Sequence, residues 1–466
     1  MLSKEETIAA LSTPESKGAI AIIRLSGDKA FEIINKCFAP YNNEFDLKNP
    51  PLHYQILGEF TEPSNKKSID QVIVILNKEP NSYTGENMAE INCHGGLAVI
   101  QEILQCLIKN GARIADPGEF TKRAFLNNKI DLAQAEAVCD IINAQTTTAK
   151  NIALKQLKGN LSEQLNIIRD QIINAAAEIE LALDFPEEDV DIPTKEKIVS
   201  HFETAIDEIN NLINKGNKAR LFRDGARVLL VGKPNVGKSS VFNAILGKER
   251  AIVTPHAGTT RDTIECTIDL NGIPVTLVDS AGVRESQNAI EKIGIEKTLK
   301  EIELADLILV LLEANSPFDE EDFKLLDICK KSNCLVVLNK TDLNKSVDIK
   351  ILESYLPISD IIKISALKKT GLSQLEMHIK EKLLGDSNKD YDQKEDFLIT
   401  NLRHISLLEK TKEDLKRSLD GFINGMSGEL IMVDIYEGLD SIGEITGHKV
   451  GDDVLNAIFS RFCIGK

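Results

Sequence analysis

The sequence predicts a multidomain fold in which an α+β domain is followed by an all-α domain, and the all-α domain is interrupted by an inserted α/β domain. Three observations predict it. Short β-like runs mix with helical patterns over residues 1–128, helical periodicity fills 129–222 and returns over 386–466, and apolar strands alternate with helices over 223–385. The 466 residues are enough for roughly three domains of ~150 residues each.

The first segment contains two strand patterns, at 19–27 and 71–76, and two helical patterns, at 28–37 and 97–110. Asp131 opens a helical pattern that continues over 151–184 and 195–215, with an interruption at Asp184-Phe185-Pro186 because proline ends a helix. A polar linker at 386–396 precedes further helices over 397–460. We therefore expect the helices before residue 222 to pack with those after 397.

The inserted segment carries apolar strand candidates at 228–231, 275–278, 307–312, 335–338 and 361–364, with helices between them. This alternation is typical of a doubly wound sheet. Asn271-Gly272 lies between two further apolar runs and predicts a hairpin. One antiparallel strand pair is therefore expected at the edge of this sheet.

Composition limits the classes of protein. Apolar residues make up 42% and charged residues 27%, no apolar run reaches the ~18 residues of a membrane span, and no secretory signal opens the chain. Eight cysteines show no metal-ligand spacing, so we predict reduced thiols and a cytoplasmic protein with no membrane association. The formal charge of −17 argues against a broad basic surface for nucleic acid.

Residues 232–239 have the spacing Gly, four residues, Gly-Lys-Ser, which is typical of a loop that binds phosphates. A strand precedes the loop and a helix follows it, so backbone N–H groups can surround an anion. Lys238 is expected to reach the β and γ phosphates, and the Ser239 hydroxyl to bind Mg²⁺. The predicted nucleotide-binding residues here are Asn235, Val236, Gly237, Lys238, Ser239 and Ser240.

Guanine selection is predicted from Asn339-Lys340-Thr341-Asp342, which follows the strand pattern at 334–338. The Asp342 carboxylate can accept hydrogen bonds from N1–H and the 2-amino group of guanine. Adenine has neither donor and leaves that carboxylate unpaired, so it is strongly rejected. Asn339, Lys340, Asp342, Ser365, Ala366 and Leu367 are the predicted guanine-binding residues.

Two loops are predicted to sense the γ-phosphate. Thr260 in the polar loop 258–262 is expected to complete the Mg²⁺ shell, and Asp279 to contact Mg²⁺ through water. Ser280, Ala281 and Gly282 follow Asp279, and the Gly282 amide is expected to contact the γ-phosphate. Val283 stands where many GTPases place a glutamine that orients water, so hydrolysis needs another group.

Two residues can replace that glutamine. Asn235 can help to bind a monovalent cation, and Glu291 can align the attacking water through a second water. Arg261 and Arg284 are alternative charge stabilisers, although exposed arginines near a loop are more often simply solvated.

The chain resembles the tRNA-modification GTPase MnmE (TrmE) family along nearly its whole length. The resemblance rests on the inserted nucleotide motifs together with segments at 18–27, 82–86, 94–96, 117–126, 129–136 and 184–188, and on the terminal Phe462-Cys463-Ile464-Gly465-Lys466. It implies a Ras-like P-loop GTPase domain and a folate-binding-like N-terminal domain that forms a homodimer. It also implies a site for 5-formyl- or 5,10-methylene-tetrahydrofolate lined by Arg24, Glu90, Lys129 and Lys466.

The resemblance further implies a K⁺-activated GTPase that acts in a heterotetramer with the FAD- and NADH-dependent partner MnmG. The pair adds a 5-carboxymethylaminomethyl or aminomethyl group to the wobble uridine, U34, of certain tRNAs, using a folate one-carbon unit. Thr254, His256 and Thr259 match the loop that supplies oxygens to K⁺ with Asn235, and Thr254 and Thr259 also count as GTP-binding residues. Cys463 is a candidate for the modification chemistry.

Two other functions share part of these features. A ribosome-assembly or RNA-binding GTPase switch has the same nucleotide motifs and lacks the same glutamine, but is expected to carry a basic RNA-binding domain. A folate-dependent one-carbon transferase with a regulatory GTPase domain is the other alternative.

Overall fold

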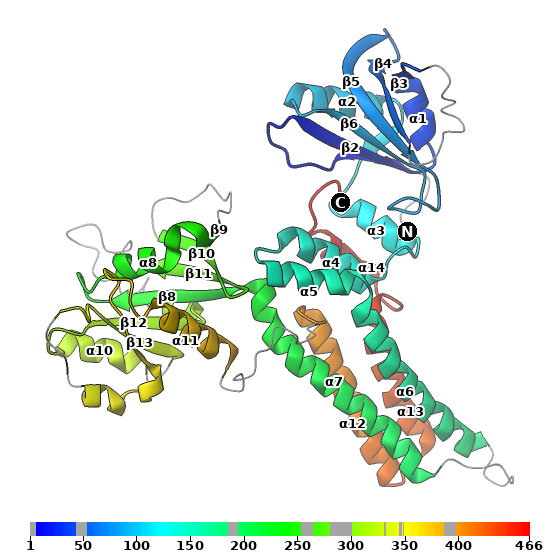
Figure 1. Cartoon of the computed structure of the whole chain (residues 1–466). Helices are drawn as coiled ribbons and strands as arrows, with labels where there is room; N and C mark the ends of the chain where they lie inside the picture. The colour runs from blue at the N-terminus through cyan, green and yellow to red at the C-terminus, as the bar shows by residue number, and fades with distance from the viewer. Residues whose placement is uncertain are drawn as a thin grey trace. The chain divides into compact units, whose positions relative to one another are not determined.

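The structure is a computed structural model that describes residues 6–42, 54–184, 194–252, 264–279, 301–329, 332–343, 347, 349–385 and 398–466. The chain divides into two compact units. The first comprises Met1–Cys139, Leu157–Ser162 and Leu439–Lys466, and the second Asp140–Gln156 and Glu163–Gly438. Figure 1 shows the elements along the chain.

The first unit contains a seven-stranded sheet with the order β3-β4-β5-β6-β2-β1-β7. Only β1 and β7 pair in parallel; the other pairs are antiparallel. Helices α1 (Ala30–Cys37) and α2 (Leu97–Lys109) bury their apolar sides against the sheet in one core. The predicted α+β domain is therefore confirmed. Its strands are β1 (Thr7–Leu11), β2 (Ile20–Ser26), β3 (Phe38–Pro40), β4 (Gln55–Glu62), β5 (Lys67–Asn77), β6 (Met88–His94) and β7 (Ala112–Ile114).

The end of the chain packs in the same unit. A small core joins α4 (Leu132–Asn143) to α14 (Asp452–Phe459) and to Phe462, and α3 (Glu119–Leu126) lies beside α14. Ser12 donates a 3.0 Å hydrogen bond from Oγ to the Gly465 carbonyl. Gly465 has φ +90°, and a Cβ there would lie 2.1 Å from the Leu11 carbonyl oxygen. Only glycine therefore allows the terminal residues to lie this close to β1.

The helices on both sides of the inserted domain pack together, as predicted. Gly216 of α7 (Lys195–Asp224) lies against Ile399 and Ile405, and the latter belongs to the buried side of α12 (Leu402–Ile423). Helix α6 ends at Asp184, and Phe185 and Pro186 lie outside the described residues. Other helices of this domain, among the residues that the structure describes, are α5 (Thr147–Leu157), α6 (Asn160–Asp184) and α13 (Gly428–Thr446).

The inserted domain is built on a second seven-stranded sheet with the order β14-β13-β12-β8-β11-β10-β9. The pairs from β14 to β11 are parallel, and β10 pairs antiparallel with β11, which confirms the doubly wound pattern. The strands are β8 (Ala226–Gly232), β9 (Ala251–Ile252), β10 (Ile264–Leu270), β11 (Ile273–Asp279), β12 (Leu307–Glu313), β13 (Cys334–Asn339) and β14 (Ile361–Lys363).

The predicted hairpin is present, with Asn271 at φ 53° and Gly272 at φ +95°. The prediction that this hairpin forms the edge of the sheet is wrong. The two-residue strand β9 pairs with β10 and is the edge strand. Helices α8 (Lys238–Arg250) and α11 (Leu372–Leu384) cover one face of the sheet (Figure 1). Helix α10 (Glu320–Cys329) and the 3₁₀ segment Ile349–Ser354 cover the other. No helix among the described residues has the length and apolar content to cross a bilayer.

Candidate functional site

The phosphate loop begins at the carboxyl end of β8 and ends at the first turn of α8. A Cβ on Gly232 would lie 2.8 Å from the Leu311 carbonyl oxygen, and one on Gly237 would lie 2.5 Å from Asn339 Nδ2. Asn235 has φ 66° and Gly237 φ +95°, both in the left-handed region. The glycines are therefore required by close packing and by backbone conformation, and the loop ends at the amino end of a helix, where anions are stabilised.

Lys238 is held across this loop. Its Nζ donates to the carbonyl oxygens of Gly232 at 2.9 Å and Lys233 at 2.8 Å, and the residue is only 8% exposed. The ammonium therefore has a fixed position beside the loop N–H groups. A cation placed this way can neutralise phosphate charge without first having to be ordered.

Ser239 and Asp279 meet where β11 ends. Ser239 donates a 3.2 Å hydrogen bond from Oγ to Asp279 Oδ2, and Asp279 is 2% exposed. Mg²⁺ prefers oxygen ligands and commonly keeps several waters. A hydroxyl beside a carboxylate, next to a phosphate loop, therefore fits the predicted magnesium site.

Asn339 connects the phosphate loop to the predicted guanine loop. At the end of β13, its Nδ2 donates to the Val236 carbonyl at 2.9 Å, and its Oδ1 accepts from the Ala366 N–H at 3.1 Å. Asn339 is 2% exposed, so both bonds lie in the interior. One side chain thus fixes the spacing between the two ends of the site.

Asp342 lies next to the loop that follows β14. Ser365 donates from Oγ to Asp342 Oδ1 at 2.6 Å, and the Lys368 N–H donates to Ser365 Oγ at 3.1 Å. The bond from Ser365 is the main reason that the pKa of the Asp342 carboxyl lies below its ordinary value. Lys340 has φ 63° and pairs with Glu313, while Leu367 is 84% exposed.

Several predicted residues lie outside the described part of the chain. They are Thr254, His256, Thr259, Thr260, Ser280, Ala281, Gly282 and Glu291, together with Arg261, Val283 and Arg284. The predicted K⁺ loop and water-orienting acid therefore stay predictions.

All four predicted folate residues lie in the first unit, and three of them, Arg24, Glu90 and Lys466, interact with one another. Arg24 donates from Nε to Glu90 Oε1 at 2.8 Å, and its guanidinium lies 5.5 Å from the ring centre of Tyr83. Burial, and then the charge of Arg24, lower the pKa of the Lys466 ammonium. Tyr83 was not predicted, although it belongs to the quoted segment 82–86.

Lys129 and Cys463 are placed differently. Lys129 Nζ donates to the Pro80 carbonyl at 2.9 Å, and its side chain lies beside Gly85. The Cys463 thiol is exposed, and its backbone carbonyl accepts from the Gly118 N–H at 3.4 Å.

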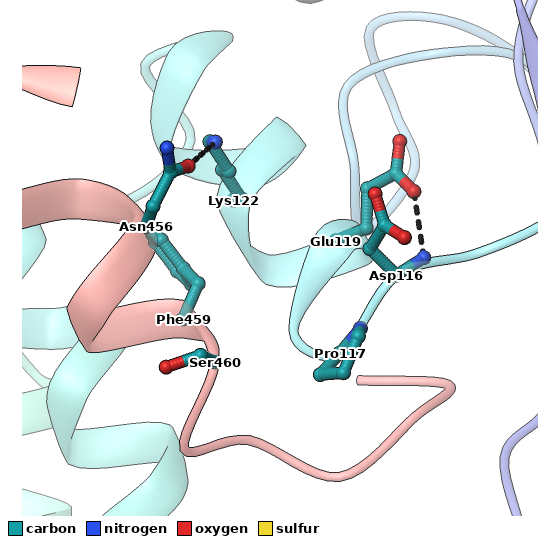
Figure 2. A pocket seen from close by; sticks show the side chains of 7 residues that line it. All are labelled: Asp116, Pro117, Glu119, Lys122, Asn456, Phe459 and Ser460. Carbon is teal, nitrogen blue, oxygen red and sulfur yellow. Dashed lines mark hydrogen bonds between the residues drawn. The ribbon is translucent and has the colours of Figure 1, made fainter. Parts of the chain in front are cut away.

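A small pocket near the chain terminus contains none of the predicted site residues. It has a volume of about 130 Å³ and is lined by Asp116, Pro117, Glu119, Lys122, Asn456, Phe459 and Ser460 (Figure 2). Lys122 donates to Asn456 Oδ1 at 2.7 Å, and the Asp116 N–H donates to Glu119 Oε2 at 2.9 Å. The first bond connects α3 to α14, and the second closes the start of α3, so the pocket is a structural junction.

The parallel sheet, the phosphate loop and the buried asparagine that joins it to a guanine-type loop define a P-loop GTPase, an enzyme that hydrolyses GTP. Sequence comparison refines this class. The family model of the MnmE helical domain matches residues 132–463, and that of the GTP-binding protein TrmE N-terminus matches residues 7–129. The chain belongs to the tRNA modification GTPase MnmE family.

Relatives in this family match over their full length. The tRNA modification GTPase MnmE of Natranaerobius thermophilus is 41% identical over 462 residues, which cover 99% of this chain and 100% of the relative. The protein of the same name from Enterococcus faecalis is 41% identical, with 99% and 98% covered. Among solved structures, the G domain of the T. maritima FeoB iron transporter is 28% identical, covers 34% of this chain and 98% of its own, and has a TM-score of 0.27. The assignment rests on the full-length relatives.

Proposed function

We propose that this chain is a K⁺-activated GTPase that, with an FAD-dependent MnmG partner, installs the 5-carboxymethylaminomethyl or aminomethyl group on U34 of certain tRNAs. The observation that carries the proposal is the full-length similarity to relatives named tRNA modification GTPase MnmE. The guanine end of the site supports it, because Asn339 and Ser365 fix Asp342 beside the phosphate loop.

In the GTP step, Lys238 neutralises phosphate charge. Ser239 and Thr260 would hold Mg²⁺, which would supply further positive charge when bound. The Lys238 and Ser239 hydrogen bonds support these roles. Asn235, Thr254, His256 and Thr259 would hold K⁺, which would supply the positive charge that other GTPases take from an arginine. Glu291 orients the attacking water in place of the glutamine that Val283 replaces.

In the modification step, the N-terminal segment 1–128 binds 5-formyl- or 5,10-methylene-tetrahydrofolate and forms the homodimer. Arg24 and Lys466 suit the glutamate tail of a folate and Glu90 suits its pterin, since these groups need cations and a carboxylate respectively. The closeness of Arg24 and Glu90 supports a shared site. Lys129, whose ammonium donates to the Pro80 carbonyl, also contributes to the site, and Cys463 takes part in the chemistry. The protein acts in the cytoplasm, with the GTPase domain at 223–385 and the helical domain at 129–222 and 386–466.

Purified full-length protein tests the cation step. GTP hydrolysis should be several-fold faster in K⁺ than in Na⁺ at equal ionic strength, and Asn235→Ala should remove the difference while GDP still binds. Glu291→Ala should slow hydrolysis in K⁺ by about a hundredfold or more. Equal rates in the two salts would reject K⁺ activation, and full activity of Glu291→Ala would reject its role.

A further inference from the structure

Lys233, the second residue of the phosphate loop, is paired with the start of α10. Its Nζ lies 2.7 Å from Asp319 Oδ2 and 2.8 Å from Asp322 Oδ2. Lys233 extends from the end of β8, whereas the two aspartates lie 86 and 89 residues later in the chain. The sequence motif for phosphate binding leaves this position open, so nothing in the motif assigns it a role.

The two aspartates already form the cap of α10. Asp319 Oδ1 accepts from the N–H groups of Glu321 at 3.0 Å and Asp322 at 3.2 Å, and Asp322 Oδ2 accepts from the Asp319 N–H at 3.0 Å. This reciprocal arrangement is a capping box. A cap needs acceptors but does not need two full negative charges, so the pairing with Lys233 is a separate feature.

The charge of Asp322 is poorly solvated. Its side chain is 5% exposed, and Oδ1 is buried with no hydrogen-bond donor among the described residues. A buried carboxylate without a cation is unfavourable. The ammonium of Lys233 is in contact with it. Burial lowers the pKa of Lys233, but the two aspartates outweigh burial and raise that pKa above its ordinary value. Lys233 is therefore charged at any physiological pH.

The same residue also contacts the phosphate-binding lysine. The Lys233 carbonyl accepts a 2.8 Å hydrogen bond from Lys238 Nζ. The side chain of Lys233 thus fixes the loop to α10, while its main chain fixes the cation that meets the nucleotide. Loss of the side chain would leave two unneutralised carboxylates beside a site for a polyanion.

We propose that Lys233 sets the affinity for GTP by neutralising Asp319 and Asp322, two carboxylates that would otherwise repel the polyanion bound at the phosphate loop. The proposal goes beyond the tRNA reaction, because it concerns affinity for GTP and GDP in the isolated enzyme. Lys233 does not touch the reacting atoms in this account, so the turnover number at saturating GTP should change little.

The test measures Kd for GDP and for a non-hydrolysable GTP analogue, with kcat and KM for GTP, on the full-length protein. Lys233→Met should weaken binding of both nucleotides by about tenfold at low salt, and the deficit should shrink as salt screens the repulsion. Lys233→Arg should bind within about threefold of wild type, because it keeps the charge. Lys324→Met removes an exposed cation from the same helix and is the matched control, which should bind as wild type.

Charge removal separates this proposal from a purely structural contact. Asp319→Asn with Asp322→Asn keeps oxygen acceptors for the cap but removes both charges, and in the Lys233→Met background it should restore binding to within about threefold of wild type. Thermal unfolding without nucleotide reports any loss of folding. If Lys233→Met does not fold, the two asparagine substitutions with Lys233 retained should still tighten GDP binding. Unchanged affinity in Lys233→Met, no rescue by the asparagines, or no tightening when Lys233 is retained would each overturn the proposal.

Discussion

Ser365 Oγ lies 2.6 Å from Asp342 Oδ1 and donates a hydrogen bond to it, so the loop after β14 holds the carboxylate that follows β13. Ser365 is only 1% exposed and is therefore fixed by its surroundings. The bond favours the ionised form of Asp342, which is the form that accepts hydrogen bonds from guanine. Base selection thus depends on two adjacent loops.

Asp342→Asn should weaken GDP binding by about a hundredfold or more, because an amide donor would face the N1–H and 2-amino donors of guanine. The variant should gain affinity for xanthosine diphosphate, whose 2-carbonyl accepts from that amide. Kd measurements with both nucleotides check this. Asp420→Asn, an exposed site on α12, is the control and should bind GDP normally. Normal GDP binding by Asp342→Asn would contradict base reading by this carboxylate.

Asn339→Ala should remove nucleotide binding and lower the stability of the inserted domain by ~2–4 kcal/mol. The Val236 carbonyl and the Ala366 N–H would lose their partner in the interior. Denaturant unfolding and GDP binding measure the two effects. Asn333→Ala, which removes an exposed bond just before the same strand, should change either quantity little. Similar behaviour of the two variants would show that Asn339 does not connect the loops.

Glu90→Gln should weaken 5-formyl-tetrahydrofolate binding by about tenfold, since it removes a carboxylate that pairs with Arg24. GTP hydrolysis by the isolated protein should not change. Calorimetry with the folate measures the affinity, and Glu102→Gln, an exposed residue of α2, serves as the control. Unaltered folate binding would remove Glu90 from the site.

Arg123→Met should destabilise the first unit by ~3–5 kcal/mol at neutral pH, because Glu119 and Glu86 would lose a cation in the interior. Glu119 is 2% exposed. Burial raises its pKa, but hydrogen bonds from Arg113, the Asp116 N–H and Arg123 outweigh burial and leave the pKa below its ordinary value. A carboxyl whose pKa is lower in the folded than in the unfolded state stabilises the fold at pH values above its unfolded pKa. This stabilisation is lost as the pH falls through the folded pKa.

The difference in unfolding free energy between wild type and Arg123→Met should therefore be largest near neutral pH and shrink as the pH falls through the lowered pKa of Glu119. Urea unfolding at several pH values measures it. Lys36→Met breaks an exposed pair with Glu32 and should change stability by only ~0–1 kcal/mol. A difference that grows on acidification would contradict the assigned charges.

The sequence predicted the inserted sheet well because its strands are buried on both faces. The patterns at 307–312 and 335–338 differ by only one residue at an end from β12 (Leu307–Glu313), and by one residue at each end from β13 (Cys334–Asn339). Two-residue β9 had no comparable apolar pattern, which is why the hairpin was placed at the edge.

Contacts between loops could not be predicted in the same way. The pairs Ser365–Asp342 and Lys233–Asp322 join residues 23 and 89 positions apart through side chains whose types are common on surfaces. Their pairing depends on the strand order β14-β13-β12-β8, which no local periodicity records. Tyr83 was missed for a related reason. Its ring meets Arg24 of β2 only because the chain between β5 and β6 returns to β2 in the folded sheet.

The most direct measurement is the nucleoside composition at the tRNA wobble position in a strain that lacks this chain and carries either the wild-type protein or Asp342→Asn. The account predicts that the deletion removes the aminomethyl-type uridines, that wild type restores them, and that Asp342→Asn does not, although Asp420→Asn does. Unchanged uridines in the deletion strain, or full restoration by Asp342→Asn, would contradict a GTP-driven role in wobble-uridine modification.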